Sequence, residues 1–119
     1  MRPVYHPALS DITVEGILHA LSNSVRVQIF SDIARGEHPQ NCSKFLMVNN
    51  QQLPKSTLSQ HFRILREAGL IRSERSGVEL HNSTRCTELK PLYGTMVTAI
   101  VEAYIEQQKR AGLSGKKRA

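Results

Sequence analysis

The stretch Leu53–Gly69, LPKSTLSQHFRILREAG, carries a start signal and a stop signal that bound a single helix. Pro54 suits the first turn of a helix, where the internal hydrogen-bond ladder does not need its backbone N–H. Gly69 suits the position just after a helix, where the backbone often adopts a positive φ. The two residues together predict one helix, on which the direction of every side chain is fixed by the helical period.

This predicted helix has one apolar face and an opposite face of unusual composition. A rotation of about 100° per residue places Leu58, Phe62 and Leu65 on one side, with His61 beside them. The other side carries Ser56, Ser59, Gln60 and Arg63. Short hydroxyls allow a helix to approach a surface closely, Gln can pair with adenine in the major groove, and Arg can fork onto guanine or hold a phosphate. The polar face therefore favours a DNA-reading helix; the alternative is an exposed helix that is merely rich in serine, since Ser and Gln are common surface residues.

The segment after this helix predicts a short two-stranded hairpin. The run LIRSER is followed by Ser76-Gly77, which suits a two-residue turn, and by VELHNSTR, in which apolar and polar residues alternate. Arg72 and Arg75 then lie on or near the hairpin. A recognition helix followed by a basic hairpin is the arrangement of a winged helix-turn-helix, in which the hairpin lies along the phosphate backbone.

The segment from Leu18 to Arg85 resembles the arsenic-repressor (ArsR) family of small winged-helix repressors of bacteria and archaea. The resemblance rests on LSNSVR, on KSTLSQHFRILREAGLIRSE and on the hairpin glycine Gly77. It implies a homodimeric repressor that releases its operator when an effector binds, and a terminal helix that pairs with the partner subunit. Arg26 matches an arginine of the family pattern, and two roles remain open for it: an ion pair or helix contact, and a contact with DNA phosphate.

The formal charge of the chain is +6, from 16 Lys and Arg against 10 Asp and Glu. This excess points to a polyanionic partner, for which nucleic acid is the simplest candidate. Part of it lies between Lys55 and Arg75, and part lies in the terminal run GLSGKKRA. No apolar run approaches the roughly 18 residues that a membrane helix requires, and the N-terminus has no apolar signal-peptide region. We therefore expect a cytoplasmic protein that does not contact a membrane.

The length of 119 residues favours one domain, mainly α with a small β-hairpin. We expect residues 1–9 to form an extended arm, residues 10–111 the winged-helix DNA-binding and dimerisation domain, and residues 112–119 a disordered basic tail. The expected order is four helices, two strands and a fifth helix. Besides the helix after Pro54, the predicted elements are a first helix capped by Ser10 or Asp11, a second helix Val25–Arg35, a third helix Cys42–Val48, a turn Asn49–Gln52 and a final helix opened by Thr87 or Pro91 and ending near Arg110.

The final helix carries an apolar stripe that is too broad for a lone surface helix. Its members are Leu89, Leu92, Tyr93, Met96, Val97, Ile100, Tyr104 and Ile105. The stripe fits the dimerisation role that the family resemblance implies.

Metal ligands of the kind that many family members use are missing from this sequence. Such relatives carry a Cys-x-Cys pair on the third helix or Asp and His pairs on the last helix, whereas the third helix here has only Cys42, and residues 89–110 contain no His, Asp or Cys. No nucleophile with a matching base, carboxylate pair or Gly-rich phosphate loop is present either. We expect no metal, no cofactor and no enzyme activity.

Two cysteines and one histidine keep alternative roles. Cys42 opens the third helix, where the helix dipole stabilises a thiolate, and Cys86 precedes the final helix, so both are candidates for a redox or effector site. The alternative is that Cys42 is a small buried hydrophobe and Cys86 a spacer. His61 lies at the edge of the apolar face and either packs between helices or contacts DNA.

The sequence therefore predicts a sequence-specific, DNA-binding transcriptional regulator, a dimeric repressor released by an unidentified small-molecule or redox effector. The candidate DNA-binding residues are Lys55, Ser56, Ser59, Gln60, Arg63, Arg72 and Arg75. The alternative function is a winged-helix module that binds protein, although a protein-docking face would more often expose aromatic or aliphatic anchors.

Overall fold

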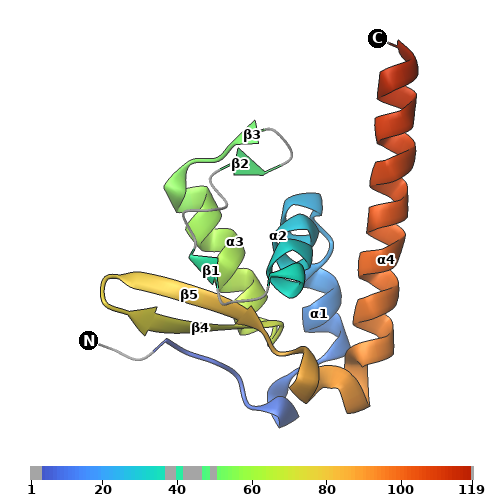
Figure 1. The fold of residues 1–119 in the computed structure, drawn as a ribbon. Coiled ribbons are helices and arrows are strands. Elements are labelled where there is room, and N and C mark those ends of the chain that lie inside the picture. Colours follow the sequence, from blue (N-terminus) through green and yellow to red (C-terminus); the bar gives the residue numbers. More distant parts are fainter. Residues whose placement is uncertain (1–3, 37–39, 42–46, 49–50, 119) are drawn as a thin grey trace.

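A computed structural model of the chain describes residues 4–36, 40–41, 47–48 and 51–118, with side chains for residues 4–36 and 53–112 (Figure 1). Its helices are the 3-10 turn η1 (Leu9–Asp11), α1 (Val14–Ala20), α2 (Ser24–Arg35), α3 (Lys55–Glu67) and α4 (Cys86–Arg118). Its strands are β1 (Gln40–Asn41), β2 (Met47–Val48), β3 (Gln51–Gln52), β4 (Ile71–Ser76) and β5 (Glu79–Thr84). Figure 1 shows α2 and α3 above the β4–β5 hairpin, α1 beside the base of the hairpin, and α4 on the side opposite the hairpin tip.

The first two helices begin at side-chain caps. Thr13 accepts a hydrogen bond from Gly16 N at 3.0 Å, and Asn23 accepts from the N–H groups of the two residues after Ser24. Helix α2 therefore begins at Ser24, one residue before its predicted start at Val25. The predicted caps of the first helix, Ser10 and Asp11, are wrong, because both fall in the 3-10 turn η1 and Thr13 satisfies the free N–H instead.

The predicted helix after Pro54 is confirmed as α3. Pro54 is its N-terminal cap, and Gly69 follows its C-terminal cap Ala68 with φ of 87°. Leu70 N donates to Leu65 O and Gly69 N donates to the carbonyl of Arg66, which is the double hydrogen bond of a Schellman motif. This motif turns the chain sharply from α3 into β4.

The hairpin is also confirmed, with a turn one residue later than predicted. Ser76 pairs with Glu79, so the two turn residues are Gly77, with φ of 65°, and Val78, which is 96% exposed. Strand β1 adds to the outer side of β5, which gives a three-stranded antiparallel sheet in the order β1-β5-β4. Strand β4 is therefore the strand of this sheet that has a free edge beside the N-terminal segment.

The region between α2 and α3 differs from its prediction where the structure describes it. Residues 42–46 of the predicted third helix, including Cys42, lie outside the described residues, and its last two residues, Met47–Val48, form strand β2 rather than helix. Gln51–Gln52, expected in a turn, form β3 and pair antiparallel with β2. Met47 and Val48 therefore pair with the backbone of β3 instead of forming the last turn of the predicted third helix.

Helix α4 joins the core along only part of its stripe. Leu89, Val97 and Tyr104 are buried, and Tyr93 donates to the carbonyl of Ile12 at 2.8 Å, whereas Leu92 is 62% exposed. The helix begins at Cys86 and continues to Arg118, beyond the predicted end. Figure 1 shows that its first turns run at an angle to the long remainder.

The bend in α4 has a local cause in Pro91, which lies inside the helix. Proline lacks the N–H that would bond the carbonyl four residues earlier, and its ring crowds that carbonyl. The bend allows the first turns of α4 to lie at the base of the hairpin while the remainder follows α2. The predicted division into arm, domain and basic tail stays a prediction.

Gly69→Ala tests the junction between α3 and β4, with Gly77→Ala as a matched control. Both glycines have positive φ, so each substitution should cost about 1–2 kcal/mol of unfolding free energy. A Cβ at Gly69 would also overlap the side chain of the buried Ile12, whereas one at Gly77 would meet no atom within 4 Å. We expect Gly69→Ala to cost roughly 1–3 kcal/mol more than Gly77→Ala in urea unfolding. Equal losses would mean that Ile12 does not restrain this junction.

Candidate nucleic-acid interface

The two faces of α3 are separated as its sequence predicted. Leu58, Phe62 and Leu65 are between 0% and 3% exposed and belong to the main core. The side chains predicted to read DNA are exposed on the other face: Lys55, Ser56, Ser59, Gln60 and Arg63. The free face begins at the N-terminal end of the helix, which lies with the hairpin tip on the side of the molecule away from α4 in Figure 1.

Arg63 is an exposed cation of this face, and it forms a solvent-exposed ion pair with Glu67. Its Nε donates to Glu67 Oε2 at 3.1 Å, across one helical turn, and the two side chains are 70% and 50% exposed. Such exposed pairs contribute well under about 1 kcal/mol. A phosphate or a guanine edge can therefore replace Glu67 at little cost.

Arg26 of α2 contacts both α1 and α3. Its guanidinium is buried and donates from Nε to Ala20 O at 2.7 Å and from Nη2 to His19 O at 3.1 Å, at the C-terminal end of α1. Its Nη1 lies 3.4 Å from Nδ1 of His61 on α3. One side chain of α2 therefore links α1 to α3. Of the two roles left open by the sequence, the helix contact is the one that the geometry supports.

His61 is a packing residue in this arrangement. Its ring is half-buried, and burial, followed by the charge of Arg26, lowers the pKa of His61 below its ordinary value of 6.5. A neutral ring can accept from Arg26 through Nδ1, whereas a protonated ring cannot. The contact with Arg26, rather than DNA, accounts for its position at the edge of the apolar face.

A buried polar cluster joins α3 to the hairpin, and the sequence analysis did not find it. Arg66 Nη1 donates to Ser73 Oγ at 3.0 Å, and Ser73 Oγ donates to Asn82 Oδ1 at 2.6 Å. Ser73 and Asn82 face each other on β4 and β5 and are 2% and 0% exposed. The available signal was a serine and an asparagine at inward positions of two paired strands, where apolar residues are usual.

The two hairpin arginines differ in position and in partners. Arg72 and Arg75 are three residues apart on β4, so their side chains leave opposite faces of the strand. Arg72 Nη2 lies 3.1 Å from Glu88 Oε2, which also accepts from Arg85 Nε at 2.7 Å. The hydrogen bond from Arg85, with a further one from Arg72, lowers the pKa of Glu88. Arg75 is exposed near the tip of the hairpin, beside His81, and no ion pair to its guanidinium is found among the described residues.

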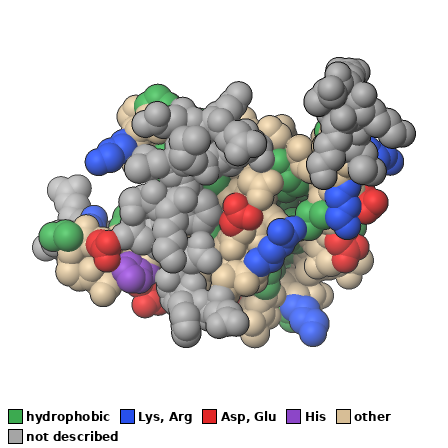
Figure 2. Space-filling view, turned by 45° about the horizontal axis from the view of Figure 1, so that its top comes forward, with side chains coloured by type: hydrophobic (Ala, Val, Ile, Leu, Met, Phe, Trp, Pro, Cys, Tyr) green, Lys and Arg blue, Asp and Glu red, His purple; other side chains and the backbone are tan. Residues whose placement is uncertain are grey.

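The charge on the face viewed in Figure 2 is dispersed. Lys and Arg side chains there are separated by uncharged surface, and over α4 they alternate with Asp and Glu. Among the described residues, the positive charge of this face is therefore not concentrated in one patch. Contacts with a polyanion would come from separate points, such as the start of α3 and the tip of the hairpin.

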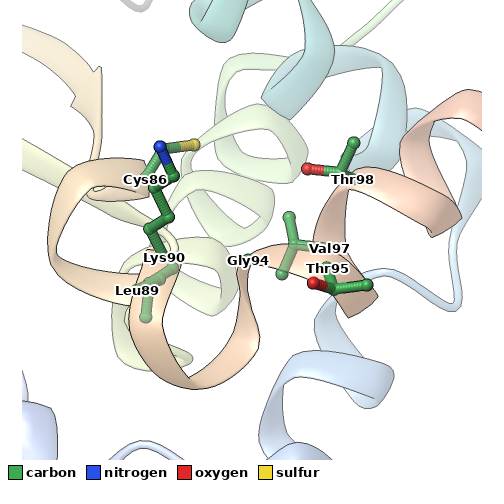
Figure 3. Close-up of a pocket in the computed structure, with 7 residues that line it drawn as sticks. All are labelled: Cys86, Leu89, Lys90, Gly94, Thr95, Val97 and Thr98. Carbon is green, nitrogen blue, oxygen red and sulfur yellow. The ribbon is translucent and has the colours of Figure 1, made fainter.

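The bend of α4 lines an open pocket of about 490 Å³ (Figure 3). Figure 3 shows Cys86, Leu89 and Lys90 on one side of the bend at Gly94, and Val97 and its neighbouring threonines on the other. The Cys86 thiol is free and exposed. Cys42, the other candidate effector residue, lies outside the described residues. Within the described part of the chain, no three His, Cys, Asp or Glu side chains form a potential metal site.

A search of that same part of the chain found no helix that is both long and apolar enough to cross a membrane.

Comparison with known proteins identifies the fold. A family model described as a helix-turn-helix domain matches residues 21–74. The solved structure of an ArsR-like transcriptional regulator from Rhodococcus sp. RHA1 superposes with a TM-score of 0.53 at 20% identity, covering 88% of this chain and 91% of that chain. The crystal structure of an ArsR family transcriptional regulator gives a TM-score of 0.55 at 19% identity, covering 82% and 93%. No curated protein matches the chain.

These similarities confirm the predicted resemblance to the ArsR family and the winged helix-turn-helix fold class. The matched segment contains both α2 and α3, and therefore both Arg26 and the exposed face that it helps to position.

The contact between Arg26 and His61 predicts a stability that depends on pH. The folded-state pKa of His61 lies below its unfolded value, so the unfolded chain binds more protons, and stability is full above about pH 6.5 and falls as the solution is acidified. We expect His61→Gln, which keeps an acceptor but does not titrate, to flatten the decline in urea-unfolding free energy between about pH 7 and pH 5. His19→Gln, at an exposed position, should keep the wild-type slope. Identical slopes in wild type and His61→Gln would contradict the assignment.

Proposed function

We propose that this chain, with its ArsR-like winged helix-turn-helix fold, is a sequence-specific transcriptional regulator that binds double-stranded DNA as a homodimer and acts in the cytoplasm. The observation that carries the proposal is the exposed Ser, Gln and Arg face of α3, which the buried Leu58, Phe62 and Leu65 hold outward. Helices of this kind enter the major groove, whose base edges present a distinct pattern for each base pair.

In this proposal the residues of α3 read the bases. Gln60 and Arg63 supply the long polar side chains for adenine and guanine, and Ser56 and Ser59 allow the helix to approach closely. Lys55, the first residue of α3, meets a phosphate at the groove edge, where the N-terminal end of the helix also favours negative charge.

Arg75 serves as the phosphate contact of the hairpin, because it is exposed near the tip. Arg72 was proposed from the sequence for the same role. Its ion pair with Glu88 and its opposite direction on β4 make it instead a link between the hairpin base and α4, although its 38% exposed side chain still adds positive potential.

The homodimer is supported by the apolar stripe of α4, which the single chain buries only in part. Leu92 is 62% exposed, and Tyr93, Met96 and Ile100 are only half-buried in the single chain. A twofold partner would cover these side chains. The two recognition helices of such a dimer would reach half-sites about one helical turn, roughly 34–36 Å, apart.

The regulatory output proposed is repression that an effector relieves. Cys86 lies beside the bend of α4, between the hairpin and the dimerisation stripe, so a modification of its thiol would act on both. Loss of DNA binding on mild oxidation of wild type, and its retention by Cys86→Ser, would support a thiol effector; unchanged binding in both would point to another ligand.

The alternative, a winged helix that docks to protein, fits the exposed face of α3 less well. Protein-docking surfaces concentrate aromatic and aliphatic anchors. The exposed positions of α3 between Lys55 and Arg63 carry none.

The proposed function is tested by an electrophoretic shift with the DNA upstream of the gene itself and by sedimentation of the free protein. We expect a saturable shift that unrelated duplex of equal length competes for poorly, and a dimer at micromolar concentration. A monomer that shifts both duplexes equally would contradict the proposal.

Base-reading and phosphate-binding residues are distinguished by how their substitutions respond to sequence and salt. Gln60→Ala or Arg63→Ala should cost about 1–3 kcal/mol on the preferred site and relax its sequence preference. Arg75→Ala should weaken all sequences alike and reduce the slope of log affinity against log salt by about 0.9. Glu67→Ala is the control for Arg63, since it releases the guanidinium without removing it. A change of specificity in Arg75→Ala, with none in Gln60→Ala, would mean that the hairpin enters the groove instead.

A further inference from the structure

The segment Val4–Ala8 is far from the hairpin in the sequence, but in the fold it lies along the base of the hairpin (Figure 1). His6 Nε2 accepts a hydrogen bond from Ser73 N at 2.9 Å. The carbonyl of Pro7 accepts from Arg85 Nη1 at 2.8 Å, and Pro7 itself is buried. Two hydrogen bonds therefore attach this segment to the base of the hairpin, one to β4 and one to the residue just after β5.

Ser73 of β4 makes hydrogen bonds to three different elements. Strand β4 pairs only with β5 in the described sheet, so the N–H that His6 receives belongs to a free strand edge. The side chain of Ser73 is at the same time held by Arg66 of α3 and Asn82 of β5. One residue thus joins the N-terminal segment, the recognition helix and both strands of the hairpin.

Arg75 lies only two residues beyond Ser73 on the same strand. Residues two apart on a strand share a face and a common backbone direction. A rotation of the strand at Ser73 would therefore displace the Arg75 side chain relative to α3. Beyond Ser73 the residues of β4 are exposed. Among the described residues, Ser73 is therefore the last position at which side chains of other elements hold β4, while β5 also pairs with β1 as far as His81.

We propose that His6 is a positioning residue for DNA binding, which fixes the hairpin against α3 through Ser73 and does so only while its imidazole is neutral. The inference rests on the proposed function, since it concerns the direction in which Arg75 reaches a phosphate. His6 itself touches no DNA in this account.

The charges around His6 explain why neutrality matters. The groups that face it are Arg66 from α3, Arg72 from β4 and Arg85 from the end of the hairpin, and the nearby carboxylate, Glu88, is already paired with Arg72 and Arg85. Burial first, and then the three guanidinium groups, lower the pKa of His6 below 6.5, against a smaller opposing effect of a hydrogen bond with the Val4 backbone. A protonated ring has no lone pair at Nε2 to offer Ser73 and adds a positive charge beside three others.

The direction of the pH effect follows from this shift. The docked segment favours the neutral ring, so docking is complete above about pH 6.5 and is lost as the pH falls through the lowered pKa. Acidification should release the segment from β4 and loosen the hairpin. The pKa of His61 is lowered as well, so the effect of His6 must be isolated by variants.

The test uses His6→Gln, His6→Ala and, as a matched control, His19→Gln in the full chain. Glutamine places an acceptor near the position of Nε2 and does not titrate, alanine removes the acceptor at every pH, and His19 is exposed on α1 away from these contacts. Two quantities are measured at about pH 8 and about pH 5.5. They are the hydrogen-exchange protection factor of the Ser73 amide without DNA, and the affinity for the preferred duplex.

We expect Ser73 protection to fall on acidification in wild type and in His19→Gln, to be low at both pH values in His6→Ala, and to stay high in His6→Gln. The affinity of His6→Ala at pH 8 should be lower than wild type by roughly 2- to 10-fold, the equivalent of one hydrogen bond, and His6→Gln should restore it. At pH 5.5 His6→Gln should bind more tightly than wild type by a similar factor.

Ser73 protection that is the same in wild type and His6→Ala would overturn the inference, and so would His6→Gln that loses affinity on acidification as wild type does. The exchange measurement needs no DNA, so it judges the contact even if the chain binds no duplex. In that case the proposed function fails while the contact between His6 and Ser73 is still tested. If His6→Ala lost the protection of the Ser73 amide as expected but bound DNA with unaltered affinity, the contact would not position Arg75.

Discussion

The burial of one face of α3 is the constraint on which the rest of the structure depends. Leu58, Phe62 and Leu65 are nearly inaccessible, and each contributes about 1.5–3 kcal/mol through its removal from water. A helix has only one side left once such a stripe is packed, so the Ser, Gln and Arg side chains must face outward. Arg26 adds direction to this packing, because its guanidinium satisfies carbonyls at the end of α1 while it meets His61 of α3. The proposed recognition surface is thus a consequence of core formation.

Apart from the buried Ile71 at its base, the hairpin is held mainly by polar contacts. Beyond Ile71 and Ser73 its β4 strand is exposed, and its base is fixed by the cluster of Ser73, Asn82 and Arg66. The neighbouring pairs of Glu88 with Arg85 and Arg72 join the same base to the first turns of α4. Hydrogen bonds of this kind define geometry closely and cost free energy when one partner is lost. The angle between hairpin and recognition helix is therefore open to influence from α4 and from the N-terminal segment.

The sequence predicted correctly the elements that depend on interactions between residues close together in the chain. The bounds of α3 follow from Pro54 and Gly69, its two faces follow from the helical period, and the hairpin follows from alternation around a glycine. The errors arose where several local solutions compete. Thr13 caps α1 although Ser10 and Asp11 have suitable side chains, and a one-residue shift in strand pairing moved the turn to Gly77 and Val78. Long-range partners were out of reach: nothing in the spacing of Arg72 indicates Glu88, sixteen residues later, or links Ser73 to His6.

The central claim, that the outward face of α3 and the tip of the hairpin meet DNA, is tested most directly by following backbone amide signals in NMR during titration with a duplex that the chain binds. The account predicts that the largest changes fall on Ser56, Ser59, Gln60 and Arg63 and on the residues around Arg75, with small changes along α4 beyond its bend. Changes concentrated on the stripe of α4, with the amides of α3 unaffected, would contradict it.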